Sequence, residues 1–463
     1  KFNLTKFLFI LTFFVFHVSL LSRFNINEFN ISNVISSIKY LTSDELEGRL
    51  CGEEGNILAQ KYILNKFKEN SLLPYNLKYL QDFNVFYPKK IEGQPYLTIT
   101  NKSNNIIKNF EYNRDFKDTF LNFRANNISF SKEDTVSFNS SALAAKTSTG
   151  EKVVFISTSM DNFDFRSSFD YNSTFDLYVN VSPKTFEEIK VAYENEYNIN
   201  CFFPYIAEET TVNNVVGVIK GSNSSLSPLV LTAHFDHLGV DLDGNIYRGA
   251  LDNASGISFL LELASFLSSL PTPDRDIIFV ALNAEEFGLL GSSSFANENK
   301  NTLQDAKVIN FDMIGSDDGI PITLMTGENE EFKSGLLDSL ISYCKNNKIA
   351  YLIENKDSSD HASFLNNGID SVTINDGDIS KIHTKYDTLE YISESAINRA
   401  FLVAISQIYN YAYNPLTLLL LENTSLIILS LILSSLEKDK NKKVKYDYLD
   451  KNERELVKRK EYE

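Results

Sequence analysis

Residues 229–252, which read LVLTAHFDHLGVDLDGNIYRGALD, decide the fold of this chain. The stretch opens with the apolar run LVL, which is typical of a strand buried on both faces. Polar, titratable groups follow at His234 and Asp236, at the point where the strand stops. Open α/β sheets bind their ligands in the crevice at the carboxyl ends of the strands. We therefore expect His234 and Asp236 to lie in a functional crevice.

Helices and strands alternate along the rest of the chain. Strands are predicted at residues 213–220, 276–281, 307–311 and 369–374, and helices at residues 254–269, 287–297, 330–346 and 393–412. Strands that alternate with helices imply crossover connections and a parallel sheet that is covered on both sides. The predicted fold is therefore a three-layer α/β/α sandwich with a largely parallel central sheet.

Residues 81–205 differ in composition from the rest of the chain. They are rich in Phe, Tyr, Asn and Ser, and short runs such as residues 96–100 and 153–158 favour β-strands. A turn-rich segment of this kind, placed before a clear α/β region, is typical of a β-rich inserted domain. The segment contains no histidine and no tight carboxylate cluster. We expect it to shape access to the site and not to perform chemistry.

The region before this segment contains an acidic loop and a helix. An amphipathic helix is predicted from Asn56 to about Asn70. The loop at residues 41–49 reads LTSDELEGR, and its charged residues, Arg49 included, are expected to face solvent.

Length and charge limit the possible functions. The chain has 463 residues, more than the about 250 to 300 that one hydrophobic core supports, so two domains with appendages are expected. It carries 61 Asp and Glu against 44 Lys and Arg, a formal charge of -17. A strongly acidic chain repels phosphate backbones, so nucleic acid is not an expected partner.

Apolar runs lie near both ends of the sequence. Residues 7–21 follow two lysines, which predicts a signal peptide or signal anchor over residues 1–24. Residues 414–436 form a second apolar run, which precedes a charged tail at residues 437–463. A charged residue, Glu422, stands inside this run and favours a packed helix or hairpin over a membrane span. We expect a secreted or extracytoplasmic protein, with membrane association through either apolar end left open.

Seven residues at or just after predicted strand ends could carry chemistry: His234, Asp236, Asp252, Glu285, Glu286, Asp312 and His383. Imidazoles and carboxylates are the ligands that zinc and similar divalent metals prefer when no thiolate is present. The three cysteines are too few and too scattered for a cysteine-based zinc site. Several carboxylates packed together without a cation would repel one another. The set therefore predicts a metal site, most simply a dinuclear cation centre.

Five motifs in order resemble the zinc exopeptidase family that contains the bacterial leucyl-type aminopeptidases, the glutamate carboxypeptidases and the glutaminyl cyclases. They are HFDHLG (234–239), GALDNASG (249–256), NAEEFGLLGS (283–292), NFDMIG (310–315) and IHTKYDT (382–388). The loop LTSDELEGR is similar to the amino-terminal approach of that family. A single short motif is weak evidence, but five in order are a strong signal.

The resemblance implies a role for each candidate. Asp252 would bridge two zinc ions per chain, with His234 and Asp312 completing one site and Glu286 and His383 completing the other. Glu285 would be the general base, and Asp236 would accept a hydrogen bond from His234 and fix its tautomer. His237 and His361 are expected either to pack in the interior or to form hydrogen bonds with metal ligands, without binding the metal themselves. Two cations about 3.5 to 4 Å apart would polarise the scissile carbonyl.

The resemblance divides the chain into functional parts. A metallopeptidase domain is expected at residues 25–80 and 206–413, interrupted at residues 81–205 by an insert similar to protease-associated domains. The expected activity is that of an aminopeptidase, which removes residues from the amino-terminal end of peptides or proteins. Arg248 and Lys385 lie near the site in the sequence and keep a carboxypeptidase open. A glutaminyl cyclase and a non-catalytic binding ectodomain are the further alternatives.

Overall fold

The structure is a computed structural model that describes residues 12–13, 27–317, 319–329, 334–414 and 431–433. The predicted signal segment, the second apolar run and the charged tail lie almost entirely outside these residues. Within the described ranges, no helix combines the length and the apolar character needed to cross a membrane.

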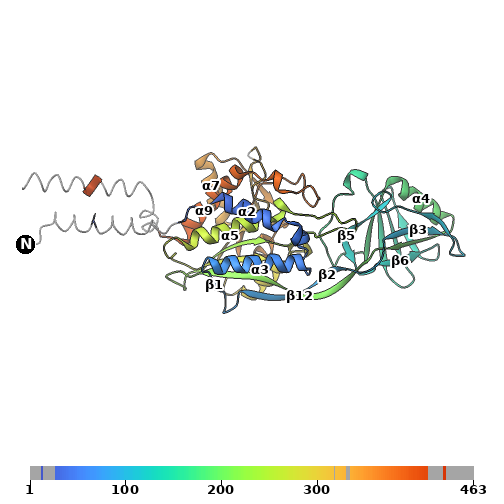
Figure 1. Cartoon of the computed structure of the whole chain (residues 1–463), viewed down its shortest axis with the longest axis horizontal. Helices are drawn as coiled ribbons and strands as arrows, with labels where there is room; N and C mark the ends of the chain where they lie inside the picture. The colour runs from blue at the N-terminus through green and yellow to red at the C-terminus, as the bar shows by residue number, and fades with distance from the viewer. Residues whose placement is uncertain (1–11, 14–26, 318, 330–333, 415–430, 434–463) are drawn as a thin grey trace, which may run out of the picture.

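One mixed sheet forms the centre of the larger part of the molecule (Figure 1). Its strands run in the order β1-β12-β14-β13-β15-β18-β16-β17, and β2 pairs with β12 beside this path. The four central strands, β14, β13, β15 and β18, are parallel, whereas β12 and β16 join them in antiparallel fashion. The predicted parallel arrangement thus holds at the centre of the sheet, and the outer strands make it mixed. The strands are β1 (Leu73–Pro74), β2 (Leu80–Lys90), β12 (Tyr205–Ile219), β13 (Leu229–His234), β14 (Ile277–Leu282), β15 (Lys307–Phe311), β16 (Ile322–Thr326), β17 (Tyr351–Asn355) and β18 (Asp370–Asn375).

Helices cover both faces of this sheet and complete three layers. One face contacts α2 (Ile31–Leu41), α3 (Glu54–Glu69), α5 (Gly256–Ser268), α7 (Gly335–Asn347) and α9 (Glu394–Ala412). The other face contacts α6 (Leu290–Asn299) and α8 (His361–Leu365). The three-layer α/β/α prediction is confirmed.

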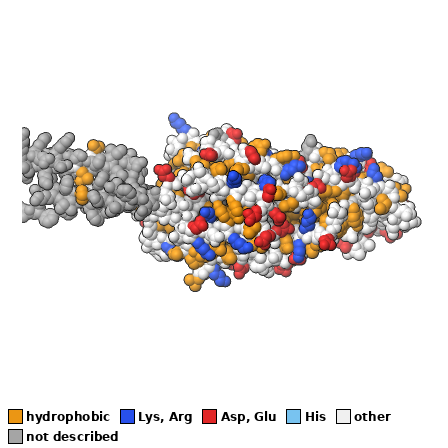
Figure 2. All heavy atoms as spheres, in the orientation of Figure 1, with side chains coloured by type: hydrophobic (Ala, Val, Ile, Leu, Met, Phe, Trp, Pro, Cys, Tyr) orange, Lys and Arg blue, Asp and Glu red, His pale blue; other side chains and the backbone are white. Residues whose placement is uncertain are grey.

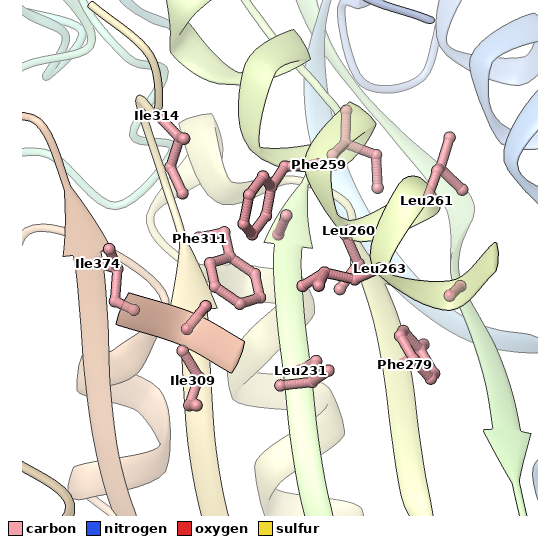
Figure 3. Packing of buried hydrophobic residues seen from close by; sticks show 14 of the residues in the cluster. Leu231, Phe259, Leu260, Leu261, Leu263, Phe279, Ile309, Phe311, Ile314 and Ile374 are labelled. Atoms are coloured by element: carbon pink, nitrogen blue, oxygen red, sulfur yellow. The ribbon is translucent and has the colours of Figure 1, made fainter. Parts of the chain in front are cut away.

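The side chains of the central strands explain why both faces are covered. In β13, Leu231 packs under α5 while its neighbour Val230 packs toward α6 and α8. Successive side chains of a strand point to opposite faces, so an unbroken apolar run has two apolar faces. Figure 3 shows Leu231 beneath α5, where the ring of Phe259 lies 4.9 Å from that of Phe311.

Two smaller sheets lie between β2 and β12 along the chain. Their strand orders are β5-β10-β9-β8-β7 and β4-β3-β11-β6, and α4 (Pro183–Glu194) packs against them. The strands are β3 (Tyr96–Thr100), β4 (Ile106–Asn109), β5 (Phe116–Phe123), β6 (Asn127–Phe130), β7 (Thr135–Phe138), β8 (Ala142–Lys146), β9 (Lys152–Ser157), β10 (Leu177–Val181) and β11 (Asn198–Phe202). All of these elements fall inside residues 81–205, the range predicted for the insert.

A two-stranded ribbon joins the smaller sheets to the central sheet. β12 pairs with β14 only through residues 215–219, and its preceding part pairs with β2 from Tyr205 to Val215. The ribbon runs along one edge of the molecule toward the smaller sheets (Figure 1). The core of the smaller sheets also continues into the larger part, where it includes Leu50, Leu238 and Phe287.

Acidic and basic side chains are interspersed on the face shown in Figure 2, with acidic ones most concentrated near the middle of the molecule. The three cysteines, Cys51, Cys201 and Cys344, are buried and free.

Arg49 is fully buried, so the expectation that its loop faces solvent is wrong for this residue. Its guanidinium donates hydrogen bonds to four main-chain carbonyl oxygens, at 2.6 to 3.0 Å, those of Leu41, Phe235, Arg248 and Gly249. Phe235 follows His234, and Gly249 opens the segment that carries Asp252. Arg49 therefore ties together three loops that meet at the carboxyl edge of the sheet.

The Phe259→Ala substitution should lower the free energy of unfolding by about 3 to 5 kcal/mol, because the lost ring leaves a cavity between α5 and the sheet. Urea unfolding followed by circular dichroism measures the change. Leu402→Ala is the control: this side chain of α9 is 42% exposed, and its truncation should change the free energy by less than about 1 kcal/mol.

The Arg49→Met substitution should lower the free energy of unfolding by about 3 kcal/mol or more, since it leaves several buried carbonyl oxygens without a donor. The same urea titration measures it. Arg114→Met is the matched control, because Arg114 is exposed and its ion pairs with Glu111 and Asp115 lie at the surface, where they should add little to stability. Equal effects of the two substitutions would contradict the structural role of Arg49.

Candidate metal centre

The seven candidate residues converge at the carboxyl edge of the parallel strands. His234 ends β13, Glu285 and Glu286 follow β14, and Asp312 follows β15. The remaining three lie in loops at the same edge: Asp236 just after β13, Asp252 just before α5, and His383 after β18. The carboxyl ends of neighbouring parallel strands meet at one edge, which brings residues far apart in the sequence together.

His234 and Asp312 form one half of the centre with Asp252. The His234 Nε2 atom lies 3.5 Å from Asp252 Oδ1 and 3.5 Å from Asp312 Oδ1. The side chains of His234, Asp252 and Asp312 are all buried.

His383 and Glu286 form the other half with the same aspartate. The His383 Nε2 atom lies 3.3 Å from Asp252 Oδ2 and 3.3 Å from Glu286 Oε2. The two oxygens of Asp252 therefore face two different histidines, one from each pair. This is the arrangement that a carboxylate shared between two cations requires. The ligand atoms also gather into two groups, one of His234, Glu285 and Asp312 and the other of His237, Asp252 and Glu286.

The geometry fits a metal ion in each half. Donor atoms bound about 2.0 to 2.2 Å from a tetrahedral zinc ion lie roughly 3.3 to 3.6 Å apart, which matches the distances above. Asp312 Oδ1 is buried and has no hydrogen-bond partner in the described part of the chain, as expected for an atom that binds a cation. Nitrogen and oxygen donors without thiolates suit zinc and also other divalent metals.

Asp236 holds the turn that carries the two glutamates. Its two carboxylate oxygens accept hydrogen bonds from the main-chain N–H groups of Glu285 and Glu286, each at 3.1 Å. His234 Nδ1 lies 3.3 Å from the main-chain oxygen of Asp236 and 3.7 Å from its Oδ1. The hydrogen bond that fixes the His234 tautomer is thus with the main chain of Asp236, where the sequence suggested its carboxylate.

Three further side chains orient the candidate ligands. The Asp387 carboxylate accepts hydrogen bonds from the main-chain N–H groups of Leu251 and Asp252, at 2.8 and 3.0 Å. The Ser359 hydroxyl donates to Asp312 Oδ2 at 2.7 Å, and His237 Nδ1 lies 2.9 Å from Glu286 Oε1. His237 therefore contacts the carboxylate of Glu286, a candidate ligand. His361 lies farther out, where its ring contacts Thr373 and the carbonyl oxygen of Lys356.

Buried charges shift the pKa values of the centre. Burial raises the pKa of Glu285 well above the usual range of a glutamate. Burial lowers the pKa of His383, but Glu286 and Asp252 outweigh it and raise this pKa to about 9. Burial likewise opposes the charged form of His234, while Glu285 and Asp312 raise its pKa well above the ordinary value. The concentration of negative charge thus favours positive charge at this edge.

A cavity of about 320 Å³ opens onto the centre. Its apolar lining comes from Met313, Met325, Ile379 and Ile382, and Glu285 lines it near the metal-binding atoms, with Oε2 3.9 Å from His234 Nε2. The cavity can therefore admit an apolar side chain beside a carboxylate.

The basic residues near the cavity are paired. Lys356 lines it and binds Glu354 at 3.0 Å. Lys385 binds Asp164 at 2.8 Å. Arg248 donates to the carbonyl oxygen of Thr42 at 2.7 Å and pairs with Asp44. Neither Lys385 nor Arg248 is among the described residues that line the cavity.

Several residues of the site were missed by the sequence analysis. Asp387 stands inside the motif IHTKYDT, four residues after His383, so the motif offered a signal that was not used. Ser168 lines the cavity from the insert and donates to Glu286 Oε2 at 2.6 Å. Its local sequence, RSSFD, carries no signal of this contact.

The chain is similar to known proteins over part of its length. The Bacillus subtilis (strain 168) aminopeptidase YwaD is 31% identical over 217 residues, which cover 43% of this chain and 44% of YwaD. The chain thus matches less than half of the length of that relative.

Two solved structures share the fold. An aminopeptidase from Aneurinibacillus sp. strain AM-1 superposes with a TM-score of 0.60 at 18% identity, over 83% of this chain and 94% of that one. The Bacillus subtilis zinc aminopeptidase BSAP gives a TM-score of 0.60 at 18% identity, over 84% of this chain and 97% of that one. Residues 214–408, which carry every candidate ligand, match the family described as Peptidase family M28. This part of the chain is a peptidase family M28 domain.

Proposed function

We propose that this protein is a two-zinc exopeptidase that removes amino-terminal residues from peptides. The observation that carries the proposal is the position of Asp252, whose two carboxylate oxygens face the histidines of two separate donor pairs. The M28 domain and the aminopeptidase relatives support the same reaction class.

The residues of each half have the chemistry to hold one zinc ion. His234, Asp312 and Asp252 Oδ1 would hold one ion, and His383, Glu286 and Asp252 Oδ2 would hold the other. When bound, two such cations polarise a peptide carbonyl and offset the negative charge that develops during attack by water.

Glu285 is the proposed general base. It lines the cavity and groups with His234 and Asp312, but its Oε2 lies 3.9 Å from His234 Nε2, farther than the 3.5 Å that separates this nitrogen from Asp312 Oδ1. Its carboxylate would accept the proton of the attacking water and return it to the leaving amine. Asp236 is a positioning residue for this step, because it holds the main-chain N–H groups of the turn that carries Glu285.

The charges around the cavity favour binding of a free amino terminus. A carboxypeptidase needs a basic group that is free to bind the terminal carboxylate, but Lys356, Lys385 and Arg248 are each paired with an acidic side chain. Glu285, which lines the cavity and is not one of the proposed ligands, would attract a positive α-ammonium group. The methionines and isoleucines of the lining favour an apolar first side chain.

The Glu285→Gln substitution should reduce kcat by at least about 100-fold, because glutamine cannot accept the proton. Hydrolysis of a leucine p-nitroanilide measures turnover, and atomic absorption measures zinc per chain, which should not change. Glu298→Gln is the control on the surface of α6, where the side chain contacts Gln81, and it should keep full turnover. A fully active Glu285→Gln enzyme would exclude Glu285 as the base.

Purified wild-type protein should bind two zinc ions per chain and release the first residue of peptides with a free amino terminus. Apolar first residues should be preferred, and the same peptides with an acetylated amino terminus should resist hydrolysis. A chelator should abolish turnover, and added zinc should restore it.

The peptide panel also separates the alternatives. Release of carboxyl-terminal residues from acetylated peptides would indicate a carboxypeptidase. Ammonia release from an amino-terminal glutamine without peptide cleavage would indicate a glutaminyl cyclase. A zinc-loaded protein without turnover on any of these substrates would contradict an enzymatic function.

A further inference from the structure

A segment of the insert, residues 164–169, lies against one half of the metal centre. The Ser168 hydroxyl of this segment donates to Glu286 Oε2 at 2.6 Å, and Ser168 lines the same cavity as the metal-binding residues. A hydroxyl-to-carboxylate distance of about 2.5 to 2.7 Å is typical of a strong, charge-assisted hydrogen bond. Glu286 Oε2 is also the oxygen that faces His383.

Main-chain hydrogen bonds hold both donor residues of this half to the segment. The Phe169 N–H donates to the carbonyl oxygen of Glu286, and the Arg166 N–H donates to that of His383, each at 2.9 Å. The Phe165 ring stacks on the His383 imidazole at 5.6 Å. His383 has a φ of 58°, a left-handed conformation that needs support from its surroundings.

The segment is itself fixed to the larger part of the molecule. Asp164 binds Lys385 and the Tyr386 hydroxyl, each at 2.8 Å, and its carbonyl oxygen accepts a hydrogen bond from the Tyr247 hydroxyl at 3.0 Å. The buried guanidinium of Arg166 lies 3.6 Å from the centre of the Phe120 ring. The contacts of Asp164 and Arg166 therefore hold the segment in the position from which Ser168 binds Glu286.

The other half of the centre is oriented by the central sheet and its loops. The Ser359 hydroxyl, next to α8, donates to Asp312 Oδ2 at 2.7 Å, and His234 contacts the main chain of Asp236. Each half thus receives a serine hydroxyl on a proposed ligand carboxylate, from two different parts of the chain. Ser359 binds the oxygen of Asp312 that does not face His234, and Ser168 binds the oxygen of Glu286 that faces His383.

We propose that the 164–169 segment is part of the metal centre and that Ser168 is a positioning residue that sets the affinity of the Glu286–His383 half. The inference rests on the proposed two-zinc centre and adds a role for the insert beyond shaping access. Partners that orient a metal ligand typically change metal affinity by about 10- to 100-fold when they are removed. Removal of the Ser168 hydroxyl should therefore weaken the binding of only one of the two zinc ions.

The test is zinc titration of the metal-free full chain against a chromophoric chelator, which reports each equivalent without any substrate. Ser168→Ala should weaken one of the two equivalents by about 10- to 100-fold and leave the other as in the wild type. Ser359→Ala should weaken one equivalent only, and the double variant should weaken both, because the two serines support different halves. Ser167→Ala is the neighbouring control, since its side chain faces a separate cavity, and it should titrate as the wild type does.

A matched pair of variants isolates the hydroxyl from the shape of the side chain. Ser168→Thr keeps the hydroxyl and should bind the affected zinc equivalent as the wild type does. Ser168→Val has the same shape as the threonine variant but no hydroxyl, and it should bind this equivalent more weakly. Circular dichroism of each variant checks that the chain is folded.

The outcomes separate this inference from the proposed function. If Ser168→Ala and Ser168→Val bind both zinc equivalents with wild-type affinity, or if both equivalents weaken equally, the role of Ser168 is overturned. Either result leaves the two-zinc proposal intact. A wild-type chain that binds fewer than two zinc ions would overturn both.

Discussion

Burial of many carboxylates at one edge of a sheet is the constraint on which this structure depends. An ionised carboxylate is costly to bury unless it accepts hydrogen bonds or faces a cation. Asp236 and Asp387 accept main-chain N–H groups, and a serine hydroxyl binds one oxygen each of Asp312 and Glu286. The oxygens of Asp252 and the remaining oxygen of Asp312 face histidines instead. A metal would balance the charge of these atoms.

The fold provides this edge through ordinary packing. Apolar runs such as Leu229 to Ala233 have two apolar faces, so helices must cover the sheet on both sides, and only the strand ends remain for polar residues. Arg49 then ties the loops beyond the strand ends together through their carbonyl oxygens. The positions of the ligands follow from the strands, and their fine alignment follows from the loops.

The sequence predicted what is local and missed what depends on distant contacts. β3 and β15 begin and end where their apolar patterns predict, and the three-layer fold follows from the alternation of elements. The short β16 and β17 were not predicted, since an edge strand such as β17 is half exposed and lacks a clear pattern. Arg49 sits in an acidic, glycine-containing loop, and its partner Phe235 lies 186 positions away. Ser168 and Glu286 are 118 positions apart, and nothing near either residue indicates their contact.

The ribbon of β2 and β12 has a mechanical consequence when it is considered together with the 164–169 segment. The insert leaves and re-enters the central sheet through two strands paired along their length, so it is hinged to the larger part along one edge. Its second attachment, through Asp164 and Ser168, lies at the metal centre. These attachments, together with the core that the insert shares with Leu50, Leu238 and Phe287, remove the freedom of the insert to swing about the ribbon. A force on the insert would therefore reach the Glu286 side chain through Ser168, and with it one half of the centre.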